Sequence, residues 1–131
     1  MSKTNVGLIG TGISGSLSPV MHETEGVLHG LDYHYRCFDF NAMQLNINEL
    51  GELLSDLETQ QYRGVNITYP CKQLVKQYLD VLDGDAMAIG AVNTVLFKEG
   101  KRIGYNTDGI GFYQSLKQEI NVKYIKHVVI F

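Results

Sequence analysis

The sequence has little cysteine, little proline and no long apolar run in its 131 residues. Its two cysteines, Cys37 and Cys71, are isolated from each other, which excludes a disulfide-rich scaffold and a paired-cysteine metal site. No segment approaches the roughly 18 consecutive apolar residues of a membrane-spanning helix, and no apolar leader follows Met1. These absences predict a cytoplasmic protein with reduced thiols, no metal and no membrane partner.

An excess of positive charge is also lacking. The chain has 11 Lys and Arg against 14 Asp and Glu, for a net charge of −3, and its basic residues are scattered. This excludes an extended phosphate-binding surface, so we expect no nucleic-acid partner. With 44% hydrophobic residues, a chain of this length can bury one core and form one globular domain.

Short apolar runs alternate with helical patterns along the chain. The runs predict strands at 5–9, 33–39, 64–67, 91–97, 102–105 and 127–131. A turn at Gly100 joins two of these strands into a hairpin, and a short turn is expected at Asp83–Asp85. The pattern predicts the α/β class: a mainly parallel mixed sheet with an antiparallel hairpin, and helices on both faces.

Four helices are expected between the strands. Ser18 is a candidate N-cap with Pro19 in the first turn, and Asn41 with Gln44 fits a capping box. Pro70 and Asn106–Asp108 mark the starts of the other two helices. The apolar positions that define the four helices are Val20, Val27, Leu28 and Leu31; Leu50, Leu53, Leu54 and Leu57; Leu74, Val75, Tyr78, Leu79 and Leu82; and Ile110, Tyr113, Leu116 and Ile120.

A glycine pattern follows the first strand. Gly10, Gly12 and Gly15 match G-x-G-x-x-G, and Asp39 ends the next strand, where a ribose-binding acid would lie. In a dinucleotide site the third glycine lies in a helix whose N-terminus faces the pyrophosphate. Here the helix signal begins only at Ser18, so Gly15 is expected in a loop. A stand-alone dinucleotide-binding module through Gly10–Gly15 is therefore an alternative interpretation, and a turn without any ligand is another.

Polar side chains gather in four of the predicted turns. Ligands of open α/β sheets bind at the carboxyl ends of strands, and hydroxyls and amides there suit a small hydroxylated acid. Taken singly, Ser18, Thr68 and Thr107 have the simpler interpretation of helix caps. The candidate substrate-binding residues are Ser16, Ser18, Asn66, Thr68, Asn93 and Thr107.

Two charged residues are candidates for catalysis. Lys72 lies at the start of the third predicted helix and can exchange a proton with a substrate hydroxyl, which hydride transfer at the same carbon requires. Asp108 can orient the ammonium group and accept a hydrogen bond from that hydroxyl. Its simpler interpretation is a favourable carboxylate in the first turn of the last helix.

These motifs resemble the N-terminal substrate domain of the shikimate dehydrogenase family. The resemblance rests on Ser16–Pro19, Asn66–Lys72, Gly90–Thr94 and Asn106–Gly109, and covers nearly the whole chain. It implies a catalytic pair of Lys72 and Asp108, a substrate carboxylate held by the two serines, and ring hydroxyls held by Asn66, Thr68, Asn93 and Asp108. The implied reaction is the reversible reduction of 3-dehydroshikimate to shikimate with NADP or NAD, in aromatic amino-acid biosynthesis.

Two departures from the family pattern bear on substrate and domains. The family commonly has proline where this chain has Gly12, and the surrounding residues resemble the branch that also oxidises quinate, often with NAD. The cofactor domain of the family is not in this sequence, so we expect a substrate-binding catalytic domain at 1–124 and the start of a truncated dinucleotide-binding domain at 125–131. An exposed apolar strand at that end would favour a homodimer.

Overall fold

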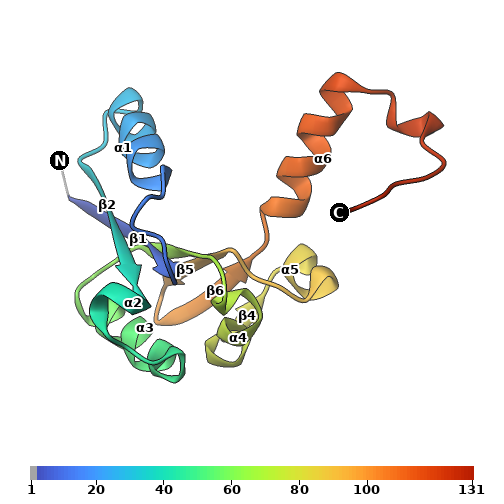
Figure 1. The fold of residues 1–131 in the computed structure, drawn as a ribbon. Helices are drawn as coiled ribbons and strands as arrows, with labels where there is room; N and C mark the ends of the chain where they lie inside the picture. The colour runs from blue at the N-terminus through green and yellow to red at the C-terminus, as the bar shows by residue number, and fades with distance from the viewer. Residues whose placement is uncertain (1–2) are drawn as a thin grey trace.

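The computed structural model describes residues 3–131, and within this range six strands form one mixed sheet (Figure 1). The strands are β1 (Thr4–Gly10), β2 (Tyr33–Asp39), β3 (Gly64–Ile67), β4 (Val81–Leu82), β5 (Thr94–Lys98) and β6 (Lys101–Tyr105). Their order across the sheet is β2-β1-β3-β5-β6-β4. β1 pairs in parallel with β2 and β3, β4 pairs in parallel with β6, and β5 is antiparallel to both of its neighbours.

Helices cover both faces of the sheet, as predicted. They are α1 (Ser18–Leu28), α2 (Phe40–Met43), α3 (Leu50–Thr59), α4 (Cys71–Leu74), α5 (Gly84–Ile89) and α6 (Asp108–Glu119), with 3-10 turns at Ile47–Glu49, Val75–Tyr78 and Val122–Tyr124. α1 lies on one face of the sheet, and α2, α3 and α4 lie on the opposite face (Figure 1). α6 projects away from the sheet and contains no buried residue (Figure 1).

The main core lies between the sheet and α3. Successive strand residues point to opposite faces, so in β1 Ile9 belongs to this core whereas Leu8 belongs to a smaller cluster with Ile13 and Tyr35 on the α1 side. The four leucines of α3, predicted as one stripe, are all buried. Truncating one of them, such as Leu54→Ala, would cost about 2–5 kcal/mol because the cavity would be enclosed by sheet and helix.

Several predicted elements are confirmed. β2 and β3 have the predicted bounds, and the hairpin of β5 and β6 turns at Glu99 and Gly100, which both have positive φ. Two residues of positive φ between paired strands form the tight turn that matches the twist of a hairpin. Gly30, with φ of 66°, follows the C-terminus of α1 and closes that helix as expected.

The third predicted helix is wrong beyond Tyr78. The chain is helical from Cys71, but Leu82 lies in β4, which pairs with the outer edge of β6. The pairing with β6 gives the backbone N–H and C=O groups of this segment the hydrogen-bond partners that a helix would have given them. The strand therefore forms although the leucine spacing predicts a helix. The predicted turn at Asp83–Asp85 is the start of α5, where the Asp83 side chain accepts a hydrogen bond from the Asp85 N–H.

Two predicted helix starts are shifted. The capping box is formed by Asn46 and Glu49, not by Asn41 and Gln44. Residue Gln44 has a left-handed backbone and ends α2 instead. Ser18 is the first residue of α1 and not its N-cap, because the preceding turn is closed by the Ser16 Oγ, which accepts a hydrogen bond from the Ser18 N–H.

The apolar face of α1 and the last predicted strand also differ from expectation. Val20, Val27 and Leu28 are exposed, because α1 approaches the sheet through Gly26, where a Cβ would lie 2.5 Å from the Tyr33 Cβ. Residues 126–131 form no strand and pair with no strand in the described part of the chain. An isolated strand has no backbone partners, which accounts for the irregular conformation of this apolar run.

Candidate functional site

The candidate site forms where β3 ends and β5 begins. β5 runs antiparallel to β3 with Thr94 opposite Asn66, so the start of β5 lies beside the end of β3. β6 ends beside the same point, with Tyr105 opposite Thr94. Asn93 and Asn106–Asp108 therefore share one edge of the sheet with the end of β3. This is the carboxyl edge of the parallel strands, where α/β sheets bind ligands.

Lys72 and Asp108 form an ion pair at this edge. The Lys72 Nζ lies 2.5 Å from the Asp108 Oδ2, although the two residues come from α4 and α6. Their side chains are 36% and 55% exposed, so a small molecule can reach both. Sequence reasoning proposed these two residues as partners, and the structure brings them into direct contact.

Asn93 holds Asp108 and Thr107 in place. Its Nδ2 donates to the Thr107 Oγ1 at 2.7 Å and to the Asp108 Oδ1 at 2.9 Å. Its Oδ1 accepts from the Thr107 N–H at 2.9 Å and from the Thr94 Oγ1 at 3.1 Å. Asn93 is buried, and its full set of partners explains an amide in an otherwise apolar run.

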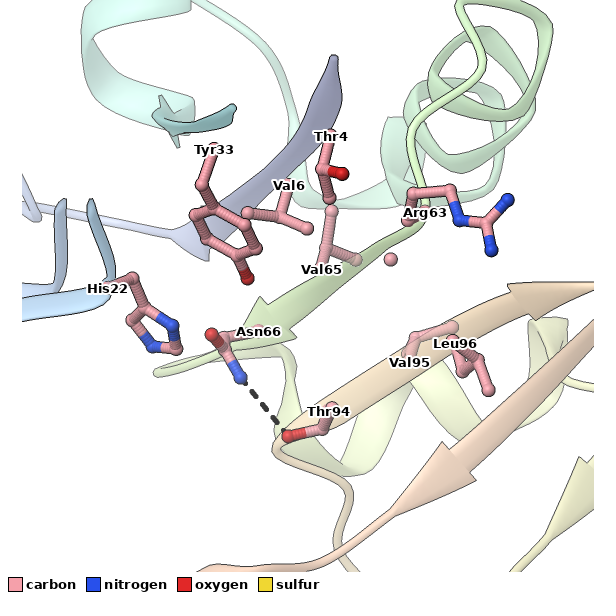
Figure 2. Close-up of a pocket in the computed structure, with 11 residues that line it drawn as sticks. Thr4, Val6, His22, Tyr33, Arg63, Val65, Asn66, Thr94, Val95 and Leu96 are labelled. Carbon is pink, nitrogen blue, oxygen red and sulfur yellow. Dashed lines mark hydrogen bonds between the residues drawn. The ribbon is translucent and has the colours of Figure 1, made fainter. Parts of the chain in front are cut away.

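Asn66 extends this network toward β3. Its Nδ2 donates to the Thr94 Oγ1 at 3.1 Å and to the Asn93 carbonyl oxygen at 3.4 Å, and its Oδ1 accepts from the Tyr35 hydroxyl at 2.8 Å. Figure 2 shows Asn66 and Thr94 at one end of a hollow on the α1 side of the sheet, whose walls include His22. The network therefore runs without a break from β2 to Lys72.

Three predicted site residues lie outside this network. Ser16 and Ser18 form the turn before α1 and hydrogen-bond each other, not Lys72 or Asp108. Thr68 follows β3, and its N–H donates to the Ile9 carbonyl oxygen at 2.9 Å. Its methyl group lies 2.4 Å from where a Cβ of Gly10 would be, so the first glycine of the loop is required by close packing.

The glycine loop is closed by Asp39 and does not have the geometry of a dinucleotide site. The Asp39 carboxylate accepts hydrogen bonds from the backbone N–H groups of Gly12 at 3.0 Å, Ile13 at 2.8 Å and Asn41 at 3.0 Å. Burial alone would raise the pKa of Asp39, but these N–H groups hold it below its ordinary value. Gly15 lies before α1 rather than in it. The acid that would bind a ribose is thus used to fix the loop.

The arrangement suits proton exchange with a hydroxylated ligand. An ammonium and a carboxylate in contact can share a proton with one ligand hydroxyl, while amides and hydroxyls beside them orient the rest. Among residues 3–131, no group of three His, Cys, Asp or Glu side chains is placed to hold a metal ion. The same residues include no helix with the length and hydropathy of a membrane span.

Fold and site together define an α/β substrate-binding domain with a lysine–aspartate pair at the carboxyl edge of its sheet. The model of the shikimate dehydrogenase substrate binding domain matches residues 8–95. The chain belongs to the shikimate dehydrogenase family and corresponds to its N-terminal substrate-binding domain. The prediction of family and domain is confirmed.

Individual relatives of known name or structure support the same family. The chain is 49% identical over 111 residues to the shikimate dehydrogenase (NADP+) of Pseudarthrobacter chlorophenolicus, covering 85% of this chain and 38% of that enzyme. It is 37% identical to the Listeria monocytogenes shikimate 5-dehydrogenase solved with shikimate and NAD, with a TM-score of 0.81 over 89% of this chain and 39% of that one. The quinate dehydrogenase of Corynebacterium glutamicum, solved with NAD, gives 37% identity and a TM-score of 0.82 over 88% of this chain and 42% of that one. The chain thus spans less than half the length of these relatives.

Three residues of the network are not among the predicted site residues. Thr94 and Asn106 stand beside predicted site residues, and Asn106 rather than Thr107 caps α6, because its Oδ1 accepts from the N–H groups of Asp108 and Gly109. Tyr35 was placed in a strand without a role. Its period-two alternation with Tyr33 and Cys37 was the available signal that it faces α1.

Proposed function

We propose that this chain is the part of an oxidoreductase that binds shikimate and 3-dehydroshikimate and handles the proton in their reversible interconversion. The observation that carries the proposal is the contact of Lys72 with Asp108, held by Asn93 at the carboxyl edge of the sheet. Membership of the shikimate dehydrogenase family supports this substrate class.

Lys72 is the proposed proton donor and acceptor. In reduction, its ammonium gives a proton to the carbonyl oxygen of 3-dehydroshikimate as that oxygen becomes a hydroxyl. In oxidation, the neutral amine takes the hydroxyl proton back. Asp108 accepts a hydrogen bond from the Lys72 ammonium, which fixes the direction of the Nζ and stabilises its charge. Asn93 in turn fixes the Asp108 carboxylate.

The remaining predicted residues are proposed to hold the substrate. Ser16 lies in the turn before α1 and Ser18 is the first residue of α1, whose N-terminal N–H groups favour an anion, so both serines are assigned to the carboxylate of the substrate. The ring hydroxyls are assigned to Asn66, Thr68, Asn93 and Thr107. Thr68 lines a hollow with Lys72, and Asn93 donates to both Thr107 and Asp108. Each ring hydroxyl can both donate and accept, which suits amides and threonine hydroxyls.

A nicotinamide cofactor, when bound, would supply the hydride for the reduction in its reduced form, NADPH or NADH, and would take it back in the oxidation. The loop of this chain that resembles a dinucleotide site does not fit one, because Asp39 is committed to Gly12 and Ile13. We therefore assign cofactor binding to a second domain of a longer enzyme, with 1–124 as the substrate domain and 125–131 as the beginning of the second. A cytoplasmic location and a homodimer remain predictions of the sequence.

Quinate is the second candidate substrate. The likeness to a quinate dehydrogenase of known structure favours it, as does Gly12 in the first loop. Quinate is also a carboxylate with ring hydroxyls, so the same residues would hold it.

The test is a titration of the 15N-labelled chain with shikimate and with quinate, followed by NMR. We expect saturable shifts of the backbone amides of Ser16, Thr68 and Asp108. Asp108→Asn should weaken binding, whereas Asp85→Asn, which changes a carboxylate in the first turn of α5, should leave it unchanged. If neither acid perturbs these amides in the wild-type chain, the proposed function is wrong.

A further inference from the structure

Tyr35 connects the two halves of the proposed site. It lies in the middle of β2, it is only 7% exposed, and its hydroxyl donates to the Asn66 Oδ1 at 2.8 Å. β1 lies between β2 and β3, so the Tyr35 side chain reaches across the central strand on the α1 side of the sheet. A side chain that spans three strands to meet one amide oxygen has a tightly restricted position.

α1 holds Tyr35 from the other side. The His22 ring stacks on the Tyr35 ring, with 4.5 Å between ring centroids, and the Glu23 Oε1 accepts from the Tyr35 backbone N–H at 3.0 Å. Burial raises the pKa of the Tyr35 hydroxyl. Tyr35 thus contacts α1 close to the serines proposed to hold the carboxylate. Its hydroxyl stays protonated at neutral pH and can donate to Asn66.

Two contacts fix the Asn66 amide: the Asn93 carbonyl oxygen sets which way it points, and the Tyr35 hydroxyl donates to the amide oxygen. The Asn66 nitrogen faces Thr94 and its oxygen faces away from Thr94, toward α1 (Figure 2). If the amide were reversed, its oxygen would face the Asn93 carbonyl oxygen, and two acceptors would oppose each other. Both amide protons already have acceptors in the protein, so only a lone pair of Oδ1 remains for a ligand.

We propose that Tyr35 is a positioning residue that holds the Asn66 amide oxygen in place as a hydrogen-bond acceptor in the substrate site. This inference rests on the proposed function. Asn66 then selects a ligand that presents a hydroxyl donor at its position, and it disfavours a ligand with a carbonyl or ether oxygen there. In this proposal Tyr35 does not touch the substrate and acts through the position of the Asn66 amide oxygen.

The experiment compares Tyr35→Phe with Tyr33→Phe. Tyr33 lies two residues away on the same face of β2 and also stacks on His22, but no hydrogen bond joins its hydroxyl to Asn66. In the ligand-free 15N-labelled chain, Tyr35→Phe should shift the side-chain amide signals of Asn66, and Tyr33→Phe should leave them in place. The loss of one neutral hydrogen bond should raise the Kd for shikimate about three- to tenfold in Tyr35→Phe, against less than about twofold in Tyr33→Phe.

A double-mutant cycle separates positioning from general support of the fold. If Tyr35 acts through Asn66, Tyr35→Phe should not change the shikimate Kd further in an Asn66→Ala background. Additive losses would overturn the proposal, and so would Asn66 amide signals that Tyr35→Phe leaves unchanged. Absence of shikimate binding by the wild-type chain would refute the proposed function, whereas the ligand-free amide signals would still decide whether Tyr35 positions the Asn66 amide.

Discussion

Replacing Asn93 with alanine should lower the free energy of unfolding by about 2 kcal/mol. Four hydrogen bonds from this buried amide would be lost: two donated to Thr107 and Asp108, and two accepted from Thr107 and Thr94. A neutral hydrogen bond contributes about 0.5–1.5 kcal/mol, so the four together contribute about 4 kcal/mol. Thr107 and Asp108 are exposed, so water can replace their lost hydrogen bonds and recover roughly half of this free energy.

Urea unfolding followed by circular dichroism measures the effect. With a slope of about 1.5 kcal/mol per M for a chain of this size, a loss of about 2 kcal/mol lowers the midpoint by more than about 1 M. The control is Asn41→Ala, which changes an exposed asparagine whose side chain holds no other segment, and which should shift the free energy by less than about 0.5 kcal/mol.

The isosteric variant Asn93→Asp refines the argument. It keeps the acceptor oxygen for the Thr107 N–H but places a carboxylate 2.9 Å from the Asp108 Oδ1, where the amide nitrogen was. Two carboxylates at this distance repel each other when both are ionised. The free energy of unfolding of this variant should therefore fall as the pH rises through the acidic range. If Asn93→Ala were as stable as Asn41→Ala, the network described here would not hold α6 to the sheet.

Other predictions concern chemistry, acid stability and thiol reactivity. The first uses a two-domain enzyme made by joining this chain to the remainder of the Pseudarthrobacter relative. In it, Lys72→Ala should lower kcat by about 10²–10⁴-fold with little change in KM, while Lys76→Ala should leave both unchanged. An unaltered kcat in Lys72→Ala would show that Lys72 takes no part in the proton transfer. Because the pKa of Asp39 is held below its ordinary value of 3.8, its carboxylate stabilises the fold above about pH 4 and this contribution is lost as the pH falls through the lowered pKa. Asp39→Asn should therefore reduce the loss of unfolding free energy that the wild type shows below about pH 4, whereas Asp56→Asn on the exposed side of α3 should not. An Asp39→Asn variant that loses stability in acid as steeply as the wild type would contradict this role. Burial raises the pKa of Cys71 to about 11, so iodoacetamide at pH 8 should label it only on unfolding, and rapid labelling of the native chain would show that the core under α4 is open.

The parts of the fold that sequence predicts well are those with local causes. The leucine stripe of α3 and the Glu99–Gly100 turn carry their own signals in a few adjacent residues. Leu82 carried a helical signal too, but it pairs with β6, more than twenty residues further along the chain. No pattern in a short window contains that partner, so the helix was extended too far.

The same distinction holds for the site. The polar turns were visible in the sequence, and the rule that strand ends of an α/β sheet share one edge placed Lys72 and Asp108 there. Asn93 reaches the same edge because it precedes β5, which is antiparallel to β3. The order of their hydrogen bonds depends on register: Asn66 lies opposite Thr94 because β5 is antiparallel to β3, which sequence alone did not specify. Tyr35 needed a diagonal contact across β1, and no spacing rule predicts such a contact.

The hydrogen-bond network from Tyr35 to Lys72 makes the site inseparable from the fold. Its members come from β2, β3, β5 and the starts of α4 and α6, so each segment contributes only one or two groups. A fragment that lacks any one of these three strands cannot retain a weaker version of the site, because the remaining groups lose their partners. Conversely, a ligand that binds these groups only in the native state raises the free energy of unfolding of the whole sheet. Its affinity can therefore be measured from the increase in that free energy.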